Sequence, residues 1–187
     1  MDTIERARET EFLGKDFLLW LWFKSVTGHG IIDLNDADEV ELRFVGKITL
    51  LSEDDETADT VTCSGVNSRF KEARFALTQG KKITSAGIRL VVDEEEYSFT
   101  LDSKWLNFRA FKTPKVLQDD SNDPDGLFYE KAGLTEKAVS AMDNLFACFI
   151  KLRISPEWKS REMPGLTAWV RAGEQRASTQ QSYRDPA

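Results

Sequence analysis

Residues 82–101 read KITSAGIRLVVDEEEYSFTL, and this stretch decides the fold. Lys82 to Val92 and Tyr97 to Leu101 are rich in β-branched and aromatic residues, which favour strands. The acidic residues 93–96 lie between the two runs and are typical of a tight connection. The sequence therefore predicts two strands joined by an acidic turn.

Further strands and one helix are expected around this pair. Alternation of apolar and polar residues predicts a strand over residues 39–51, with a bend, a bulge or a tight hairpin at Gly46. Shorter strands are expected at residues 59–64 and 106–112. Between them, Phe70, Ala73 and Leu77 form an apolar stripe that predicts a helix over residues 67–79. The expected order is strand, strand, helix, strand, strand, strand.

Two longer helices are expected outside this centre. The first covers residues 9–26, and its half from Phe17 to Phe23 is apolar on every side, so either the fold or a second subunit must surround it. The second covers residues 127–152, where Ala138, Met142 and Leu145 recur at helical spacing. We therefore predict an α+β fold, with an antiparallel-rich sheet and a strand-helix-strand centre, flanked by an N-terminal helix and a long C-terminal helix.

The domain organisation follows from changes in composition along the chain. We expect an α+β region at residues 1–117, an acidic loop at 118–126 and a helical region at 127–171 that packs on the first as one domain. A short helix beginning near Pro156 is expected to be interrupted by Pro164. Residues 172–187 contain Tyr183 as their single large apolar residue, which predicts a disordered tail.

The composition is typical of a soluble globular protein. Of the 187 residues, 41% are hydrophobic and 30% are charged, so the chain has enough apolar residues for a core. Two distant cysteines, Cys63 and Cys148, predict small buried side chains in a reducing compartment. The longest apolar run is too short to cross a bilayer, and residues 1–11 mix acids with arginines, unlike a signal peptide. We expect a cytoplasmic protein with no membrane partner.

Charge is distributed unevenly along the chain, although the formal net charge is −7. Residues 33–59 contain ten acids and two bases, whereas residues 67–92 contain six bases and one acid. Such runs commonly form solvated faces, but cations gathered on one rim of a sheet also suit a phosphate backbone. No recognition helix or aromatic stacking platform stands out, so such binding would be independent of sequence. The candidate DNA-binding residues are Lys81, Lys82, Arg89, Arg109, Lys112, Arg69 and Arg74.

Catalytic and metal-binding patterns are weak. The single histidine, His29, lies between two glycines without a carboxylate or cysteine at ligand spacing, which predicts a turn residue. Acids at residues 53–56 and 119–125 could hold Mg²⁺ for a nuclease, but both groups lie in predicted loops, where solubility explains them. We therefore expect no enzymatic activity, no metal and no cofactor.

Three segments carry a family resemblance: FLGKDFLLWLWF at residues 12–23, GKKITSAGIRL at 80–90 leading to YSFTLD at 97–102, and FRAFK at 108–112. Together they resemble the C-terminal half of the recombination-associated protein RdgC family, in a divergent, short form. The resemblance implies a nucleoid-associated, ring-shaped homodimer that encloses double-stranded DNA without sequence preference and restrains the RecA recombinase. Lys82, Arg109 and Lys112 fall where this family tends to place bases. Family members are longer, so whether a ring closes without the N-terminal half is left open.

An alternative from a different class is a dimerising interaction module that does not bind nucleic acid. The helix that is apolar on all sides and the seam of the long helix offer more apolar surface than a chain of this size easily buries. Under either hypothesis we expect a homodimer. The residues expected at its interface are Phe17, Trp20, Trp22 and Phe149.

Overall fold

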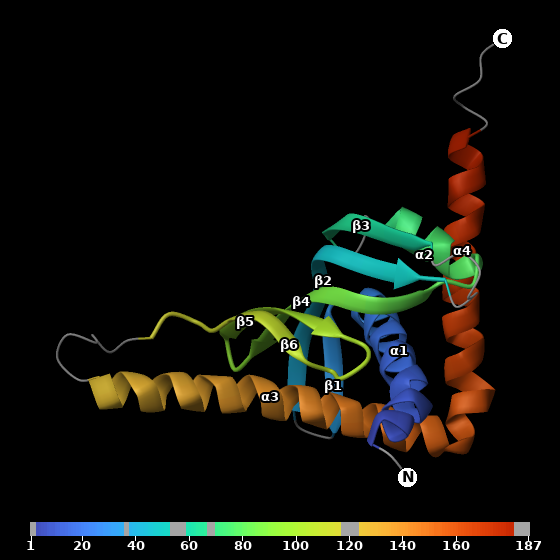
Figure 1. The fold of residues 1–187 in the computed structure, drawn as a ribbon. Coiled ribbons are helices and arrows are strands. Elements are labelled where there is room, and N and C mark those ends of the chain that lie inside the picture. The colour runs from blue at the N-terminus through green and yellow to red at the C-terminus, as the bar shows by residue number, and fades with distance from the viewer. Residues whose placement is uncertain (1–2, 36–37, 53–58, 67–69, 117–123, 182–187) are drawn as a thin grey trace.

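A computed structural model describes residues 3–35, 38–52, 59–66, 70–116 and 124–181, and it has an α+β fold (Figure 1). Its α-helices are α1 (Thr3–Thr27), α2 (Lys71–Thr78), α3 (Pro124–Ile154) and α4 (Met163–Gln181), with the π-helical turn η2 (Trp158–Glu162) between α3 and α4. Its strands are β1 (Ile31–Asn35), β2 (Asp38–Leu51), β3 (Thr60–Val66), β4 (Lys82–Val92), β5 (Glu95–Asp102) and β6 (Phe108–Lys112). The predicted fold class is confirmed.

The strands form one antiparallel sheet. Its order is β1-β2-β4-β5-β6, and β3 pairs with the second half of β2, on the edge whose first half pairs with β1. Gly46 has a left-handed φ of 72° at the point where the register of β2 against β4 shifts. Of the conformations proposed for this position, the structure therefore has the bulge. β4 and β5 form the hairpin predicted from residues 82–101.

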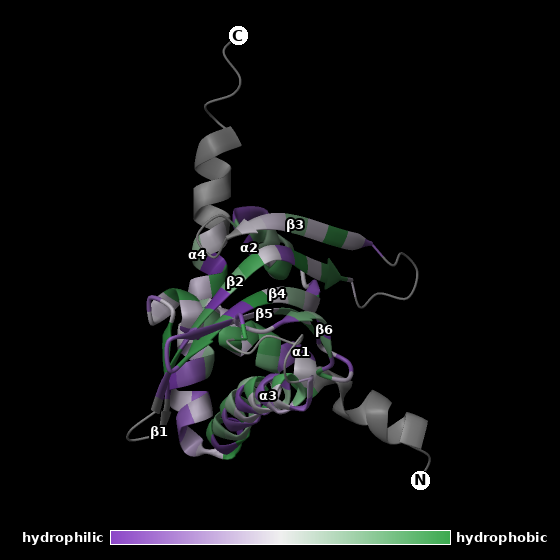
Figure 2. Cartoon of the chain, turned by 90° about the vertical axis from the view of Figure 1, so that its left-hand side faces the viewer, coloured by the Kyte–Doolittle hydropathy of each residue, from purple (hydrophilic) through white to green (hydrophobic). Residues whose placement is uncertain are grey.

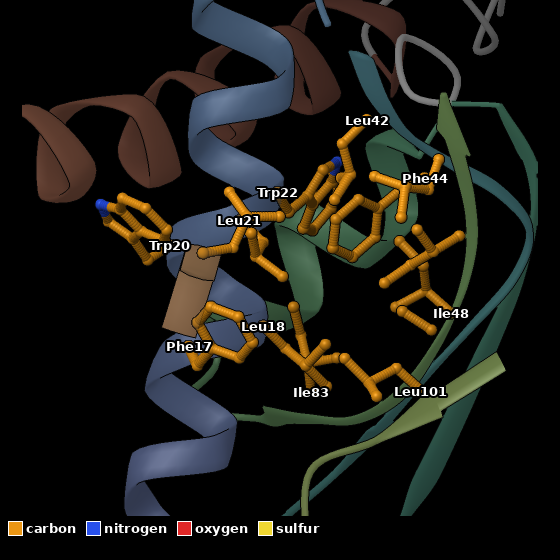
Figure 3. Close-up of a cluster of buried hydrophobic side chains, with 14 of the residues drawn as sticks. Phe17, Leu18, Trp20, Leu21, Trp22, Leu42, Phe44, Ile48, Ile83 and Leu101 are labelled. Atoms are coloured by element: carbon orange, nitrogen blue, oxygen red, sulfur yellow. The ribbon is translucent and has the colours of Figure 1, made fainter. Parts of the chain in front are cut away.

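The sheet has one apolar and one polar face. Along β4, the buried residues Ile83, Ala86, Ile88 and Leu90 point to one side, and the side chains between them are partly exposed. Figure 2 shows the corresponding alternation of hydrophilic and hydrophobic bands along the strands. Because side chains alternate across a strand, each strand contributes one row to each face. The helix α1 lies against the apolar face (Figure 3).

Helix α1 is buried on two sides, which explains its apolar circumference. Trp22 faces the sheet, where its ring centroid lies 5.9 Å from that of Phe44. On the other side, Phe17 contacts α3, with ring centroids 5.0 Å apart at Phe146 and 5.5 Å apart at Phe149. Either the fold or a second subunit was expected to surround this helix. The fold surrounds it, and no second subunit is needed.

Two predicted boundaries and one element differ from the structure. β1 was not predicted, because five residues are too few for a clear alternation. Pro164 does not end the helix: residues 156–181 are helical without a break, and the π-helical turn η2 lies directly before Met163 and Pro164. α4 continues through residues 172–181, so the first part of the predicted disordered tail is helical, and residues 182–187 lie outside the described residues.

The boundary before the helical region also shifts. α3 begins at Pro124, inside the predicted acidic loop at 118–126, and residues 117–123 lie outside the described residues. Proline suits a helix start because its φ is already helical. From Pro124, α3 runs past the sheet. The helix α4 then crosses the far end of the sheet (Figure 1). No helix in the described part of the chain is long and apolar enough to cross a membrane.

Candidate nucleic-acid interface

The polar face of the sheet brings cations from separate strands into one row. The register pairs Arg43 of β2 with Arg89 of β4, Arg89 with Ser98 of β5, and Ser98 with Lys112 of β6. Residues paired in register point to the same face, and four neighbouring strands span roughly 14 Å. Three of the four side chains in this row are therefore cations on one surface.

Three more cations lie on the same face. Lys47 precedes the buried Ile48, and Lys82 precedes the buried Ile83, so both lysines point away from the core. Arg109 of β6 pairs with Thr100, next to the buried Leu101, and shares this orientation. We call the resulting surface the basic sheet face; it consists of Arg43, Lys47, Lys82, Arg89, Arg109 and Lys112.

The arginines of the basic sheet face are held by acids. Arg89 Nη2 lies 2.7 Å from Glu96 Oε2, and this hydrogen bond raises the pKa of Arg89 and lowers that of Glu96. Glu41 Oε1 lies 2.8 Å from Arg43 Nε and 3.8 Å from Arg89 Nη1, which separates two guanidinium groups that face each other across the strands. These contacts fix the positions of the arginines and offset part of their charge.

The lysines of the basic sheet face carry its uncompensated charge. Lys47, Lys82 and Lys112 form no ion pair with any residue in the part of the chain that the structure describes. Lys47 and Lys112 are exposed, and Lys82 is half-buried at the start of β4. An anion approaching this face would therefore meet these ammonium groups without first displacing a carboxylate.

A rigid turn holds Arg109 and an exposed indole at one end of the face. The buried carboxylate of Asp102 accepts hydrogen bonds from the backbone N–H groups of Lys104 and Trp105, at 3.1 and 2.9 Å. Its other oxygen lies 3.1 Å from Arg109 Nη2. Trp105 is 53% exposed, and Lys104 Nζ lies 5.8 Å from the centre of its ring. The turn thus presents an aromatic surface beside cations.

Sequence reasoning missed Trp105. A single tryptophan between two strands gives no periodic signal, because its exposure depends on the turn that Asp102 closes. The Asp102-x-x-Trp105 spacing was the available clue, since an aspartate commonly accepts backbone hydrogen bonds from the residues that follow it. No aromatic stacking platform was expected, and the turn adds a single exposed indole beside the cations.

Three predicted DNA-binding residues do not join the basic sheet face. Lys81 precedes β4 and is 13% exposed, with its Nζ 2.7 Å from Asp59 Oδ2, so its charge is neutralised. Arg74 lies in α2 with its guanidinium 4.5 Å from the centre of the Trp169 ring, and it donates a hydrogen bond to the Trp169 carbonyl. Lys81 and Arg74 therefore make contacts within the chain and are not part of the proposed interface. Arg69 lies outside the described residues.

The predicted dimer interface is also corrected. The four residues expected there lie in the hydrophobic core of a single chain and are at most 3% exposed. Aromatic contacts from α1 to α3, to Phe70 and to the sheet fill the space around them. Side chains that are buried before association cannot supply an interface. These residues are Phe17, Trp20, Trp22 and Phe149.

Other candidate chemistry finds little support in the described residues. His29 lies in the turn between α1 and β1 with a left-handed φ of 56°, as expected for a turn residue. Among the residues that the structure describes, no three His, Cys, Asp or Glu side chains are grouped to hold a metal ion. Residues 53–56 and most of 119–125 lie outside the described ranges. Cys63 and Cys148 are free thiols, and burial raises the pKa of Cys63.

Comparisons with known proteins add no constraint. No protein-family model, no curated protein and no solved structure matches the chain. The candidate function consequently depends on the geometry of the basic sheet face and on the residues that carry the resemblance described above.

Proposed function

We propose that this chain binds double-stranded DNA without sequence preference through the basic sheet face. The observation that carries the proposal is the alignment of Arg43, Arg89 and Lys112 in one row across the sheet, with three further cations on the same face. Side chains of this type contact phosphate oxygens, which are the same in every sequence. Binding should therefore fix DNA on the sheet without reading its bases.

The placement of the helices supports the absence of sequence preference. Trp22 of α1 packs on Phe44 and on Phe70, which precedes α2, so these helices lie toward the apolar side of the sheet. Sequence-specific proteins instead insert a helix or a β-ribbon into a groove of the duplex. The basic sheet face supplies cations for contacts with the DNA backbone. None of the described helices projects from this row of lysine and arginine side chains.

The net charge of −7 is compatible with this proposal. At physiological ionic strength, charges interact over about 8 Å before salt screens them. A phosphate held at the face is therefore influenced mainly by the lysines and arginines beneath it. Overall repulsion would slow the approach of DNA, and added salt would screen this repulsion.

The resemblance to the RdgC family supports the same function. Its motifs include Lys82, Arg109 and Lys112, all of which lie on the basic sheet face. Restraint of RecA by occupation of DNA, association with the nucleoid and enclosure of DNA by a dimer belong to the proposal through this resemblance. Consistent with a binding role, we propose that the chain is not an enzyme.

The test is an equilibrium titration of a labelled duplex with the full chain. We expect unrelated duplexes of equal length to compete equally, and replacement of Lys47, Lys82 and Lys112 by alanine to weaken binding by roughly tenfold or more. The matched control replaces Lys71, Lys131 and Lys159, three exposed lysines on helices, with the same loss of charge. Equal weakening by both triple variants would contradict a specific role for the sheet face.

A second candidate, the dimerising module, is favoured by a different observation. Phe128 and Tyr129 are 67% and 72% exposed near the start of α3, and their rings contact each other. Exposed aromatic pairs are common at interfaces. Light scattering should then show a dimer that dissociates when both residues are replaced by serine, while DNA binding per chain is retained. A monomer at tens of micromolar concentration would contradict a dimer of ordinary affinity.

A further inference from the structure

A pocket of about 710 Å³ lies away from the basic sheet face, where the ends of α1 and α3 meet β1 and the segment at residues 155–162. This volume is within the range of small-molecule sites, roughly 300–1,000 Å³. Its walls include the indole of Trp20 and the side chains of Ile31 and Leu152. Ile31 is 51% exposed, so the pocket leaves apolar surface accessible.

The wall of the pocket contains a buried carboxylate that has one oxygen without a hydrogen-bond donor. Glu162 is 5% exposed, and its Oε1 lies 2.8 Å from Lys24 Nζ and 3.8 Å from Arg161 Nε. Its second oxygen, Oε2, is buried and accepts no hydrogen bond from any described residue. Buried polar atoms nearly always have a partner, and an orphaned carboxylate oxygen is costly. One residue of the pocket wall therefore has a buried carboxylate oxygen without a donor.

Trp20 supplies the complementary group. Its indole is 3% exposed, and its Nε1–H finds no acceptor among the described residues. Figure 3 shows this ring on the side of α1 away from the sheet, with the nitrogen pointing out of the core cluster. Lys24 connects the two orphaned groups, because its ammonium bonds Glu162 and lies 5.9 Å from the centre of the Trp20 ring. A donor and an acceptor without hydrogen-bond partners are thus both buried in residues of one wall.

The backbone next to the pocket is unusual in a way that fits a binding site. Glu162 is the last residue of η2, a five-residue π-helical turn, and π-helical turns occur frequently at functional sites. The turn buries Trp158, whose ring centroid lies 5.7 Å from that of Phe149, and it also buries Glu162. The neighbouring Arg161 is exposed and pairs with Glu157 at 3.0 Å. The π-helical turn therefore points the Glu162 carboxylate inward, whereas the charged side chains of Arg161 and Glu157 point outward.

The charges that line the pocket balance. Three bases, Lys24, Lys151 and Arg161, accompany three acids, Asp33, Glu157 and Glu162. A ligand with only negative charge would meet the acids, and one with only positive charge would meet the bases. Lys151 on α3 and Asp33 on β1 form no ion pair with a described residue, so one free charge of each sign is available from different walls.

We propose that this pocket binds a small zwitterion with an apolar body, such as an aromatic amino acid or a short apolar peptide. The carboxylate of the ligand would lie toward Lys151, and its ammonium group toward the acids. The body would lie against Ile31 and Leu152. None of these residues belongs to the basic sheet face, so this site is independent of DNA binding.

The test is calorimetric titration of the full chain with probes that share one body and differ in charge. Phenylalanine and the dipeptide phenylalanylphenylalanine carry both charges, phenethylamine carries the positive charge alone, and 3-phenylpropionate carries the negative charge alone. We expect a zwitterion to bind and each singly charged probe to bind at least about tenfold more weakly, because one charge-assisted contact is lost. No binding of either zwitterion, or equal binding of all probes, would overturn the proposal.

Variants identify the site and its two charged walls. Lys151→Gln should weaken zwitterion binding and leave phenethylamine unaffected, whereas Asp33→Asn should weaken the zwitterion and leave 3-phenylpropionate unaffected. The matched control is Lys159→Gln, an exposed lysine on η2 that does not line the pocket. All three positions are on the surface, so folding should be preserved. An effect of Lys159→Gln equal to that of Lys151→Gln would also overturn the proposal.

Discussion

Single residues set the close contacts that the fold requires. Gly14 lies where α1 meets the turn after β5: a Cβ added there would lie 1.8 Å from the Ser103 carbonyl oxygen. Such a contact forces the helix away from the turn that Asp102 closes. By contrast, Gly133 lies on an exposed part of α3, and an added Cβ would meet nothing within 4 Å.

The two glycines therefore predict opposite effects of one substitution. Gly14→Ala should lower the free energy of unfolding by about 1–3 kcal/mol, because the added methyl group overpacks a helix against backbone. Gly133→Ala should raise it by roughly 0.5–1 kcal/mol, since alanine favours a helix. Urea denaturation of the three proteins measures both changes. A neutral or stabilising Gly14→Ala would contradict the close approach.

The cations show which part of the site could be predicted from the sequence. In β4, Lys82 precedes the buried Ile83 and lies on the face opposite the core. The partners of Lys81 and Arg74, by contrast, come from Asp59 and Trp169, which lie 22 and 95 residues away in the chain. Local pattern contains no information on such distant contacts, so it could not separate neutralised cations from available ones.

Arg74 consequently has a structural role that can be measured. Arg74→Ala removes a guanidinium stacked on Trp169 and a hydrogen bond to its carbonyl, and should lower the free energy of unfolding by about 1–3 kcal/mol. Duplex affinity should stay within about twofold of the wild type under conditions where both proteins are folded. A loss of duplex affinity without a loss of stability would restore Arg74 to the DNA-binding residues.

At the scale of elements, long periodic segments were predictable and their assembly was not. The strands at residues 39–51 and 82–92 match β2 and β4 closely, because their alternation is long. The apolar circumference of residues 17–23 left two explanations open, since sequence does not say what surrounds a helix. The missed helix at residues 172–181 has a polar composition, so its apolar content gave no signal.

One contact between elements makes stability depend on pH. Tyr97 donates a hydrogen bond to Glu95 at 2.9 Å, and Lys137 of α3 lies 2.7 Å from the same Glu95 oxygen. Burial, followed by this hydrogen bond, raises the pKa of Tyr97 from 10.0 to about 12. The folded state therefore favours the neutral phenol over the phenolate. This contribution is complete below pH 10.0 and is lost as the pH rises to about 12.

The predicted loss from Tyr97 is roughly 2–3 kcal/mol across that interval. The stability difference between the wild type and Tyr97→Phe should shrink by this amount as the pH rises, because phenylalanine has no proton to lose. Tyr129→Phe, at an exposed position on the same fold, should follow the wild type. Chemical denaturation at several pH values measures the three profiles. A constant difference between the wild type and Tyr97→Phe would contradict the shifted pKa.

At the scale of the whole molecule, the chain buries its main apolar surfaces by itself. The aromatic residues expected between two subunits join α1, α3 and the sheet into one core. The surface includes a sheet face with six lysine and arginine side chains, a pocket with balanced charge and an aromatic pair on α3. Sequence could not distinguish burial within a chain from burial between chains, because both require the same apolar residues.

The central claim is that the basic sheet face binds the phosphate backbone, and the salt dependence of duplex binding tests it most directly. Each phosphate contact contributes about 0.9 to the slope of log affinity against log salt concentration. Replacement of Lys47, Lys82 and Lys112 by alanine should therefore reduce the slope by up to about 2.7, whereas the control variant of Lys71, Lys131 and Lys159 should keep the wild-type slope. A folded sheet-face variant with an unchanged slope would contradict the account.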